Sequence, residues 1–110
     1  MARLVRTKDL VKGTGPVAAK GDLVVIDFET YLPRGEKIHG ARRVEFVLGA
    51  RRVIAGLEAG VQGMSAGGKR EIRVPPHLGY GERGPDTIPP NAALRLLVTL
   101  HHIEKQTTPR

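Results

Sequence analysis

The sequence contains no cysteine and no tryptophan, and only two tyrosines and two phenylalanines among its 110 residues. The lack of cysteine excludes a disulfide framework and thiol chemistry, and it leaves the redox compartment open. The scarcity of aromatic rings removes the usual platforms for stacking nucleic-acid bases. The formal net charge of +7 permits contact with anionic surfaces. However, the basic residues are spread along the chain, so we expect a solvated basic surface and no nucleic-acid partner.

Long apolar runs are also lacking. No segment has the length of a signal-peptide core or of a membrane span, so we expect a cytoplasmic protein with no membrane partner. A length of 110 residues suits one domain with a single core. The 14 glycines and 8 prolines are typical of a β protein with many turns.

Metal and phosphate sites are not expected either, and we predict no cofactor. His101 and His102 are adjacent in a predicted strand, where successive side chains point to opposite faces and cannot share one metal. The segment 13–16 lacks the Lys-Ser/Thr pair of a phosphate-binding loop. The acidic residues show no spacing that forces a carboxylate pair, and we expect Glu58 to be an ordinary helix-surface residue.

Alternation of apolar and polar residues predicts the strands. In 22–32, Val24, Ile26 and Phe28 face one side and Asp27 and Glu29 the other. Turns are expected at 12–16 and 65–68, and irregular pairing is expected at 39–41. Proline and glycine should keep 77–91 free of regular structure, and so long a loop is usually functional. The predicted strands span 4–10, 22–32, 36–48, 69–74 and 92–103.

The segment 52–64 is predicted to form one short helix. Gly56 and Gly60 each cost about 1 kcal/mol relative to alanine within a helix, so we expect a neighbouring backbone to approach closely there. Between Gly49 and a stop at Gly63 there is room for about two turns, too few for a helix without tertiary support. The apolar stripe consists of Val53, Ile54, Leu57 and Val61, the first two exposed at the mouth of the structure that holds the helix.

Together these elements predict an α+β fold, in which a twisted antiparallel sheet of about five strands wraps around one short α-helix. Residues 1–110 would form a single domain with its core at about 21–104. Residues 1–20 would supply an N-terminal strand and turn, and 105–110 a polar tail.

Four short motifs then occur in order at characteristic spacing: Phe46-Val47-Leu48-Gly49, Val53-Ile54-Ala55-Gly56-Leu57-Glu58, Pro76-His77-Leu78-Gly79-Tyr80-Gly81 and Ile88-Pro89-Pro90-Asn91-Ala92. In this combination the chain resembles an FKBP, a macrolide-binding peptidyl-prolyl cis-trans isomerase. The resemblance implies isomerisation of X-Pro bonds in proline-containing peptides or unfolded polypeptides. An apolar pocket suits this reaction because the twisted amide is less polar than the planar one, and no nucleophile is needed.

The resemblance also implies roles for individual residues. The Ile54 amide and the Tyr80 hydroxyl would donate to substrate carbonyls, and His39 would stand in place of the catalytic aspartate of the family. Leu57 would form the floor of the pocket, and Ile88 would close over the ligand. The substrate-binding set would be Phe28, Ile38, Val44, Phe46, Val53, Ile54, Leu57, Tyr80, Ile88 and Leu96.

Several of these positions depart from the family pattern. Phe28 replaces a tyrosine, Ile38-His39 a Phe-Asp pair, Val44 a phenylalanine and Leu57 a tryptophan. Phe28 and His39 cannot rebuild the hydrogen-bond network of the family, and a smaller floor leaves volume around a proline ring. We therefore predict a weak isomerase with poor affinity for macrolides. The alternative is a catalytically weak or inactive module that binds proline-containing peptides.

Overall fold

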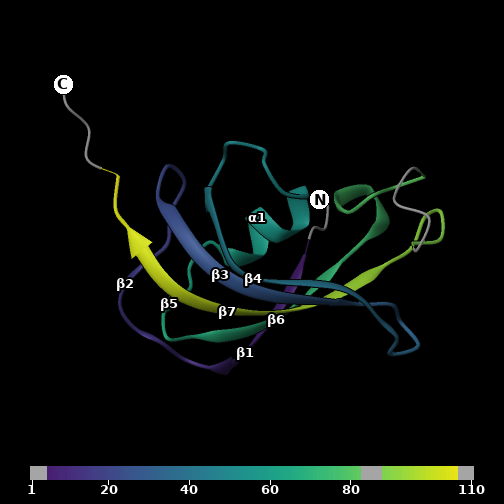
Figure 1. Cartoon of the computed structure of the whole chain (residues 1–110), viewed down its shortest axis with the longest axis horizontal. Coiled ribbons are helices and arrows are strands. Elements are labelled where there is room, and N and C mark those ends of the chain that lie inside the picture. Colours follow the sequence, from purple (N-terminus) through teal and green to yellow (C-terminus); the bar gives the residue numbers. More distant parts are fainter. Residues whose placement is uncertain (1–4, 83–87, 107–110) are drawn as a thin grey trace.

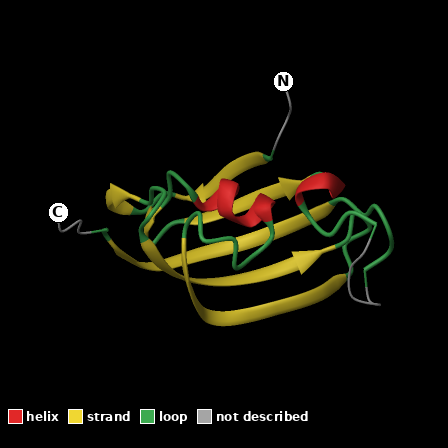
Figure 2. Ribbon diagram, turned by 90° about the horizontal axis from the view of Figure 1, so that it is seen from above, coloured by secondary structure: helices red, strands yellow, loops and turns green. Residues whose placement is uncertain are grey.

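The computed structural model describes residues 5–82 and 88–106. Its main sheet has five antiparallel strands, in the spatial order β1-β6-β7-β3-β4. One face of the curved sheet holds α1, the one α-helix among these residues (Figure 1, Figure 2). The predicted α+β fold is therefore confirmed. The elements are β1 (Arg6–Val11), β6 (Lys69–Val74), β7 (Leu94–Glu104), β3 (Leu23–Tyr31), β4 (Lys37–Val47) and α1 (Ala55–Val61).

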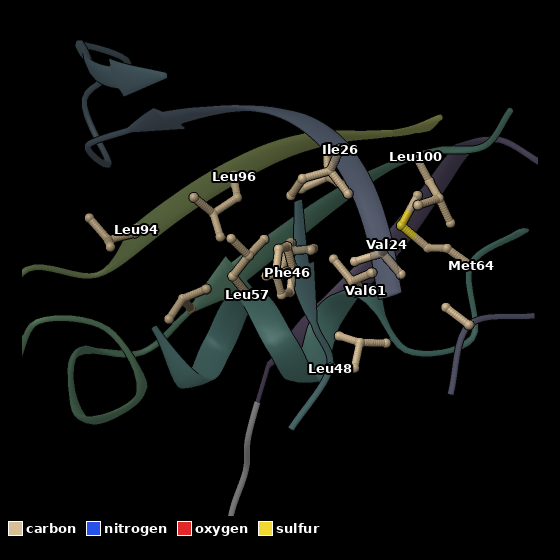
Figure 3. Close-up of a cluster of buried hydrophobic side chains, with 14 of the residues drawn as sticks. Val24, Ile26, Phe46, Leu48, Leu57, Val61, Met64, Leu94, Leu96 and Leu100 are labelled. Carbon is tan, nitrogen blue, oxygen red and sulfur yellow. The ribbon is translucent and has the colours of Figure 1, made fainter. Parts of the chain in front are cut away.

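The core lies between the helix and the concave face of the sheet. In β7, Leu94, Leu96, Val98 and Leu100 are all buried, while the intervening residues lie on the outer face. This alternation is the period of two that the sequence predicted. Figure 3 shows the apolar side chains of β3, β7 and α1 meeting around Phe46.

A second, two-stranded sheet occupies segments that we predicted to be turns. Strand β2 (Thr14–Val17) pairs with β5 (Ser65–Ala66), and the Ser65 hydroxyl donates to the carbonyl oxygen of Gly15 over 3.0 Å. The turn at 65–68 is nevertheless present, since the amide of Gly68 donates to the carbonyl oxygen of Ser65 over 3.0 Å, and β1 ends before Lys12 as predicted. What the prediction missed is the pairing of the two segments, because each finds its partner about 50 residues away. A local sequence pattern cannot show such a partner.

Both helix glycines lie where a β6 side chain presses against the helix. A Cβ atom added at Gly60 would lie 2.5 to 2.8 Å from three carbon atoms of Ile72, and one added at Gly56 would meet Val74. The predicted close approach is therefore present, but side chains rather than backbone make it. The predicted stop is confirmed, since the helix ends at Val61 and Gly63 adopts a φ of 90°.

Two charged side chains tie the ends of the helix to the rest of the chain. Arg70 on β6 donates through Nη1 to the carbonyl oxygens of Gly60 and Gln62, over 2.8 and 3.0 Å. These carbonyls belong to the last turn and have no partner within the helix. Glu58 accepts hydrogen bonds from the amides of Gly49 and Arg51. Glu58 is thus more than the surface residue that we predicted, because it fixes the loop before the helix.

Strand β4 contains two bulges. One lies opposite Asp27, where Arg43 has a φ of 55° and donates its amide to Asp27 Oδ1 over 2.9 Å. The other leaves Ile38 without a partner on β3. The two bulges flank the segment around which irregular pairing was predicted, while His39, Gly40 and Ala41 themselves pair regularly with β3. The hydrogen bond to the Asp27 carboxylate thus stabilises the bulge at Arg43, and it joins residues that are far apart in the sequence.

The segment between β6 and β7 contains one turn of 3₁₀ helix, Pro76–Leu78. This corrects the prediction that 77–91 has no regular structure. The prediction that Leu4 begins a strand, and the parts of the loop and tail at 83–87 and 107–110, lie outside the described residues. Among the described helices, none has the length and apolar character needed to cross a membrane.

Asp22 joins the start of β3 to the end of β7. Its carboxylate accepts from Lys105 Nζ over 2.6 Å, and from the amides of Gln106 and Ala19 over 2.9 Å each. The residue is 3% exposed. The hydrogen bond from Lys105, followed by that from Gln106, lowers the pKa of the Asp22 carboxyl from 3.8 to about 2.

This pKa predicts a loss of stability in acid. Because the folded pKa of about 2 lies below the unfolded value of 3.8, the Asp22 contribution is complete above about pH 4 and is lost as the pH falls toward 2. Asp22→Asn should lower the urea midpoint at pH 5 and differ little from the wild type at pH 2. Glu36→Gln, an exposed carboxyl in the turn after β3, is the control. If the urea midpoints of the wild type and of Asp22→Asn differed by the same amount at pH 5 and at pH 2, this account would be contradicted.

Candidate functional site

The ten apolar residues predicted to bind substrate all belong to, or pack against, one hydrophobic cluster. They come from β3, β4, α1 and its preceding loop, the 76–93 segment and β7. Four are buried with at most 7% exposure: Phe46, Leu57, Ile88 and Leu96. The other six are partly exposed: Phe28, Ile38, Val44, Val53, Ile54 and Tyr80. The exposed apolar surface thus comes from these six, and the four buried residues support it from below.

Ile54 is the residue that immediately precedes α1. Its backbone is extended, with φ −60° and ψ 150°, while its carbonyl oxygen accepts from the amides of Leu57 and Glu58. Among the described residues, no backbone acceptor is paired with the Ile54 amide. The first amides of a helix lack intrahelical acceptors, so this N–H group can donate to a ligand. That Ile54 donates to a substrate carbonyl, as the family resemblance implied, stays a prediction.

Tyr80 lies in a loop whose two ends are held together. The amide of Asn91 donates to the carbonyl oxygen of Gly81 over 2.6 Å. The amide of Gly81 in turn donates to the carbonyl oxygen of Pro76 over 2.9 Å. Gly81 and Asn91 both adopt positive φ, at 60° and 58°, a conformation that glycine and asparagine tolerate best. These bonds fix the loop on either side of the half-buried Tyr80 ring.

Phe28 and His39 contact each other directly. Their ring centroids are 5.4 Å apart at an interplanar angle of 61°, an edge-to-face arrangement. His39 is exposed and belongs to β4, within the strand predicted over 36–48. The contact is apolar in character and stands where the resemblance implied a tyrosine-aspartate hydrogen bond. The structure therefore brings the two departures from the family pattern together as one pair.

A groove of about 600 Å³ runs along β3 and β4 and includes Phe28, Ile38 and His39 in its wall. Much of its lining is charged, and we did not predict it. Asp27 is one of its lining residues. The Oδ2 atom of Asp27 lies 2.9 Å from Nε2 of His101. The amide of Arg43, and then His101, lower the pKa of the Asp27 carboxyl. Alternation in β3 predicted that Asp27 lies on the outer face. It did not predict the partners of Asp27, which are Arg43 on β4 and His101 on β7.

The sequence matches the FKBP-type peptidyl-prolyl cis-trans isomerase family over residues 15–101. FK506-binding protein 2 of Candida glabrata is 42% identical over 94 residues, which cover 80% of this chain and 69% of that protein. The 46 kDa FK506-binding nuclear protein of Spodoptera frugiperda is 38% identical over 105 residues, which cover 91% of this chain. The crystal structure of AtFKBP13 superposes with a TM-score of 0.79 at 31% identity, covering 87% of this chain and 90% of that one.

The fold, a curved antiparallel sheet that holds one short helix, is thus shared with that structure. The chain belongs to the FKBP-type peptidyl-prolyl cis-trans isomerase family. It spans 26% of the length of the Spodoptera frugiperda relative. The family match begins at residue 15 and ends at 101, somewhat earlier at each end than the 21–104 predicted from the motifs.

Proposed function

We propose that this chain is a peptidyl-prolyl cis-trans isomerase that acts, with reduced activity, on X-Pro bonds of unfolded or loosely folded polypeptides. Its membership of the family supports this proposal. The observation that carries it is the Ile54 amide, an available donor beside partly exposed apolar side chains. This combination can hold a peptide carbonyl while a proline ring leaves water.

The chemistry requires little beyond such a surface. Rotation about an X-Pro bond breaks amide resonance, with a barrier of about 18–20 kcal/mol. The rotated amide has lost part of its charge separation, so an apolar site stabilises it relative to the planar amide in water. Hydrogen bonds from the Ile54 amide and the Tyr80 hydroxyl to neighbouring carbonyls would orient the chain, so that binding energy favours the twisted geometry. The residues Phe28, Ile38, Val44 and Val53 would surround the ring.

Reduced activity follows from the Phe28–His39 pair. A phenyl ring has no hydroxyl to donate, and its edge-to-face contact with His39 provides no carboxylate beside the substrate. The same loss should weaken macrolide binding. A second candidate function is a module that binds proline-containing peptides without useful catalysis. The one observation in its favour is the Phe28–His39 contact.

A protease-free isomerisation assay tests the proposal. The substrate is a short peptide with an apolar residue before proline. We expect isomerisation clearly faster than the uncatalysed reaction, which takes tens to hundreds of seconds. Ile54→Pro removes the amide proton but fits the observed φ of −60°, since proline fixes φ near −65°. Its kcat/KM should lie roughly tenfold below that of Ile54→Ala, which keeps the N–H group, because one hydrogen bond is lost.

Tyr80→Phe should also reduce the rate, and melting temperatures of all three variants would show that the fold is kept. Equal rates for Ile54→Pro and Ile54→Ala would remove the amide from the mechanism. If the wild type gave no acceleration at high protein concentration, the isomerase proposal would fail. Binding of the same peptide would then support the module without catalysis.

A further inference from the structure

Three arginines lie directly opposite one another on neighbouring strands of the outer sheet face. Arg6 on β1 pairs in register with Arg73 on β6, and Arg73 pairs with Arg95 on β7. Neighbouring strands are about 4.8 Å apart, so these side chains form a continuous cationic row, the arginine row. Arg95 continues it to β3, where its guanidinium carbon lies 4.6 Å from the centre of the Tyr31 ring.

Like charges directly opposite each other destabilise a sheet, and a local conflict of this kind is expected at functional sites. One carboxylate, that of Glu71, lies 3.7 Å from Arg73 and 3.5 Å from Arg95. The Arg73 side chain nevertheless remains 64% exposed. Most of the positive charge of the row therefore faces solvent.

The row borders a groove of about 350 Å³ that is distinct from the groove along β3 and β4. All three arginines line it, and its remaining walls are apolar. We name it the arginine groove, and its apolar lining consists of Pro33, Val74, Pro75, Ala93 and Leu94. Because Val74 and Leu94 are buried in the core, the apolar surface open to a ligand comes from Pro33, Pro75 and Ala93. A ligand that fits it must combine negative charge with an apolar group.

We propose that the arginine groove binds an acidic polypeptide segment in which an apolar side chain lies between carboxylates. Guanidinium groups bind carboxylates through paired, charge-assisted hydrogen bonds, and the apolar walls receive the side chain. Single-stranded nucleic acid fits less well, because bases need exposed aromatic faces. Arg95 already covers the ring of Tyr31, which borders the row.

The groove adjoins both ends of a segment that contributes to the candidate site. Pro75 and Ala93, two of its walls, stand at either side of the 76–92 segment that carries Tyr80 and Ile88. A client chain held here would thus contact the two ends of this segment. The binding itself does not depend on isomerase activity, so it can be measured with a ligand that has no proline.

The test uses the full chain and a fluorescent peptide, Glu-Asp-Leu-Glu-Glu, with anisotropy as the readout. Arg73→Gln should weaken binding about tenfold, the effect of losing a charge-assisted hydrogen bond. Arg52→Gln is the matched control, since it removes one charge from an exposed arginine just ahead of the helix, and should change affinity less than about twofold. Arg73→Gln should not lower the melting temperature, because it relieves repulsion within the row.

Three results would overturn the proposal. Equal weakening by Arg73→Gln and Arg52→Gln would show attraction to net charge alone. A uridine oligomer of equal charge that binds more tightly and displaces the peptide would assign the row to nucleic acid. Unchanged affinity after leucine is replaced by glycine in the peptide would show that the apolar walls are not used. Because the probe lacks proline, none of these results bears on the isomerase proposal.

Discussion

Gly60→Val should destabilise the protein by about 3 kcal/mol, a large part of the 5–15 kcal/mol typical of a domain. The new side chain would enter space occupied by Ile72, which is itself completely buried. A β-branched isoleucine has few alternative rotamers, so helix and strand would have to separate. Urea unfolding at neutral pH measures the loss.

Ala59→Val is the control, because Ala59 is the adjacent helix position and is exposed. It introduces the same side chain one residue earlier in the helix, on the exposed side. It should destabilise the protein by less than about 1 kcal/mol, through helix propensity alone. If the two variants lost equal stability, contact with Ile72 would not explain the glycine. Gly60→Ala should also destabilise, although alanine is the better helix former.

The second large effect is a gain of activity. Phe28→Tyr combined with His39→Asp should raise kcat/KM roughly tenfold to a hundredfold, since it restores a donor, an acceptor and their mutual hydrogen bond. The two rings already contact each other, with centroids 5.4 Å apart, so the new hydroxyl and carboxylate would be neighbours. The measurement is the protease-free assay with an X-Pro peptide. Affinity for a macrolide of the FK506 type should rise in parallel.

Each single substitution serves as the control. Phe28→Tyr alone leaves its hydroxyl beside a histidine, and His39→Asp alone leaves a carboxylate against a phenyl ring, so neither should give more than a small part of the gain. The excess of the double variant over both singles measures the coupling between the two positions. A double variant no faster than the wild type would show that these two residues do not limit the activity.

The candidate site was predicted from motifs, and its members were found in one cluster. Their depth was predicted only in part, with Leu57 at the floor and Val53 and Ile54 at the mouth. Leu57 and Leu96 are 2% and 1% exposed, whereas Val53 and Ile54 are half-buried, although all four are apolar residues of similar size. Exposure depends on which neighbours cover a side chain, and these neighbours come from other strands.

The arginine row makes the same point for charge. Arg6, Arg73 and Arg95 are far apart in the sequence, and each was predicted only as an outward residue of a strand or as part of a scattered basic surface. Strand order and register placed them side by side. Register is specified by hydrophobic faces that become buried together, so no local window of sequence could show the row.

The sequence by itself determined the helix and the strands that alternate over many residues. In β7, alternation fixed which residues are buried before any partner was known, because successive side chains of a strand point to opposite faces. Tertiary structure alone decided the β2–β5 pairing, the bulge at Arg43 and the bonds from Arg70 to the end of the helix. Each of these depends on a hydrogen-bond partner from a distant part of the chain, and only folding brings such partners within reach.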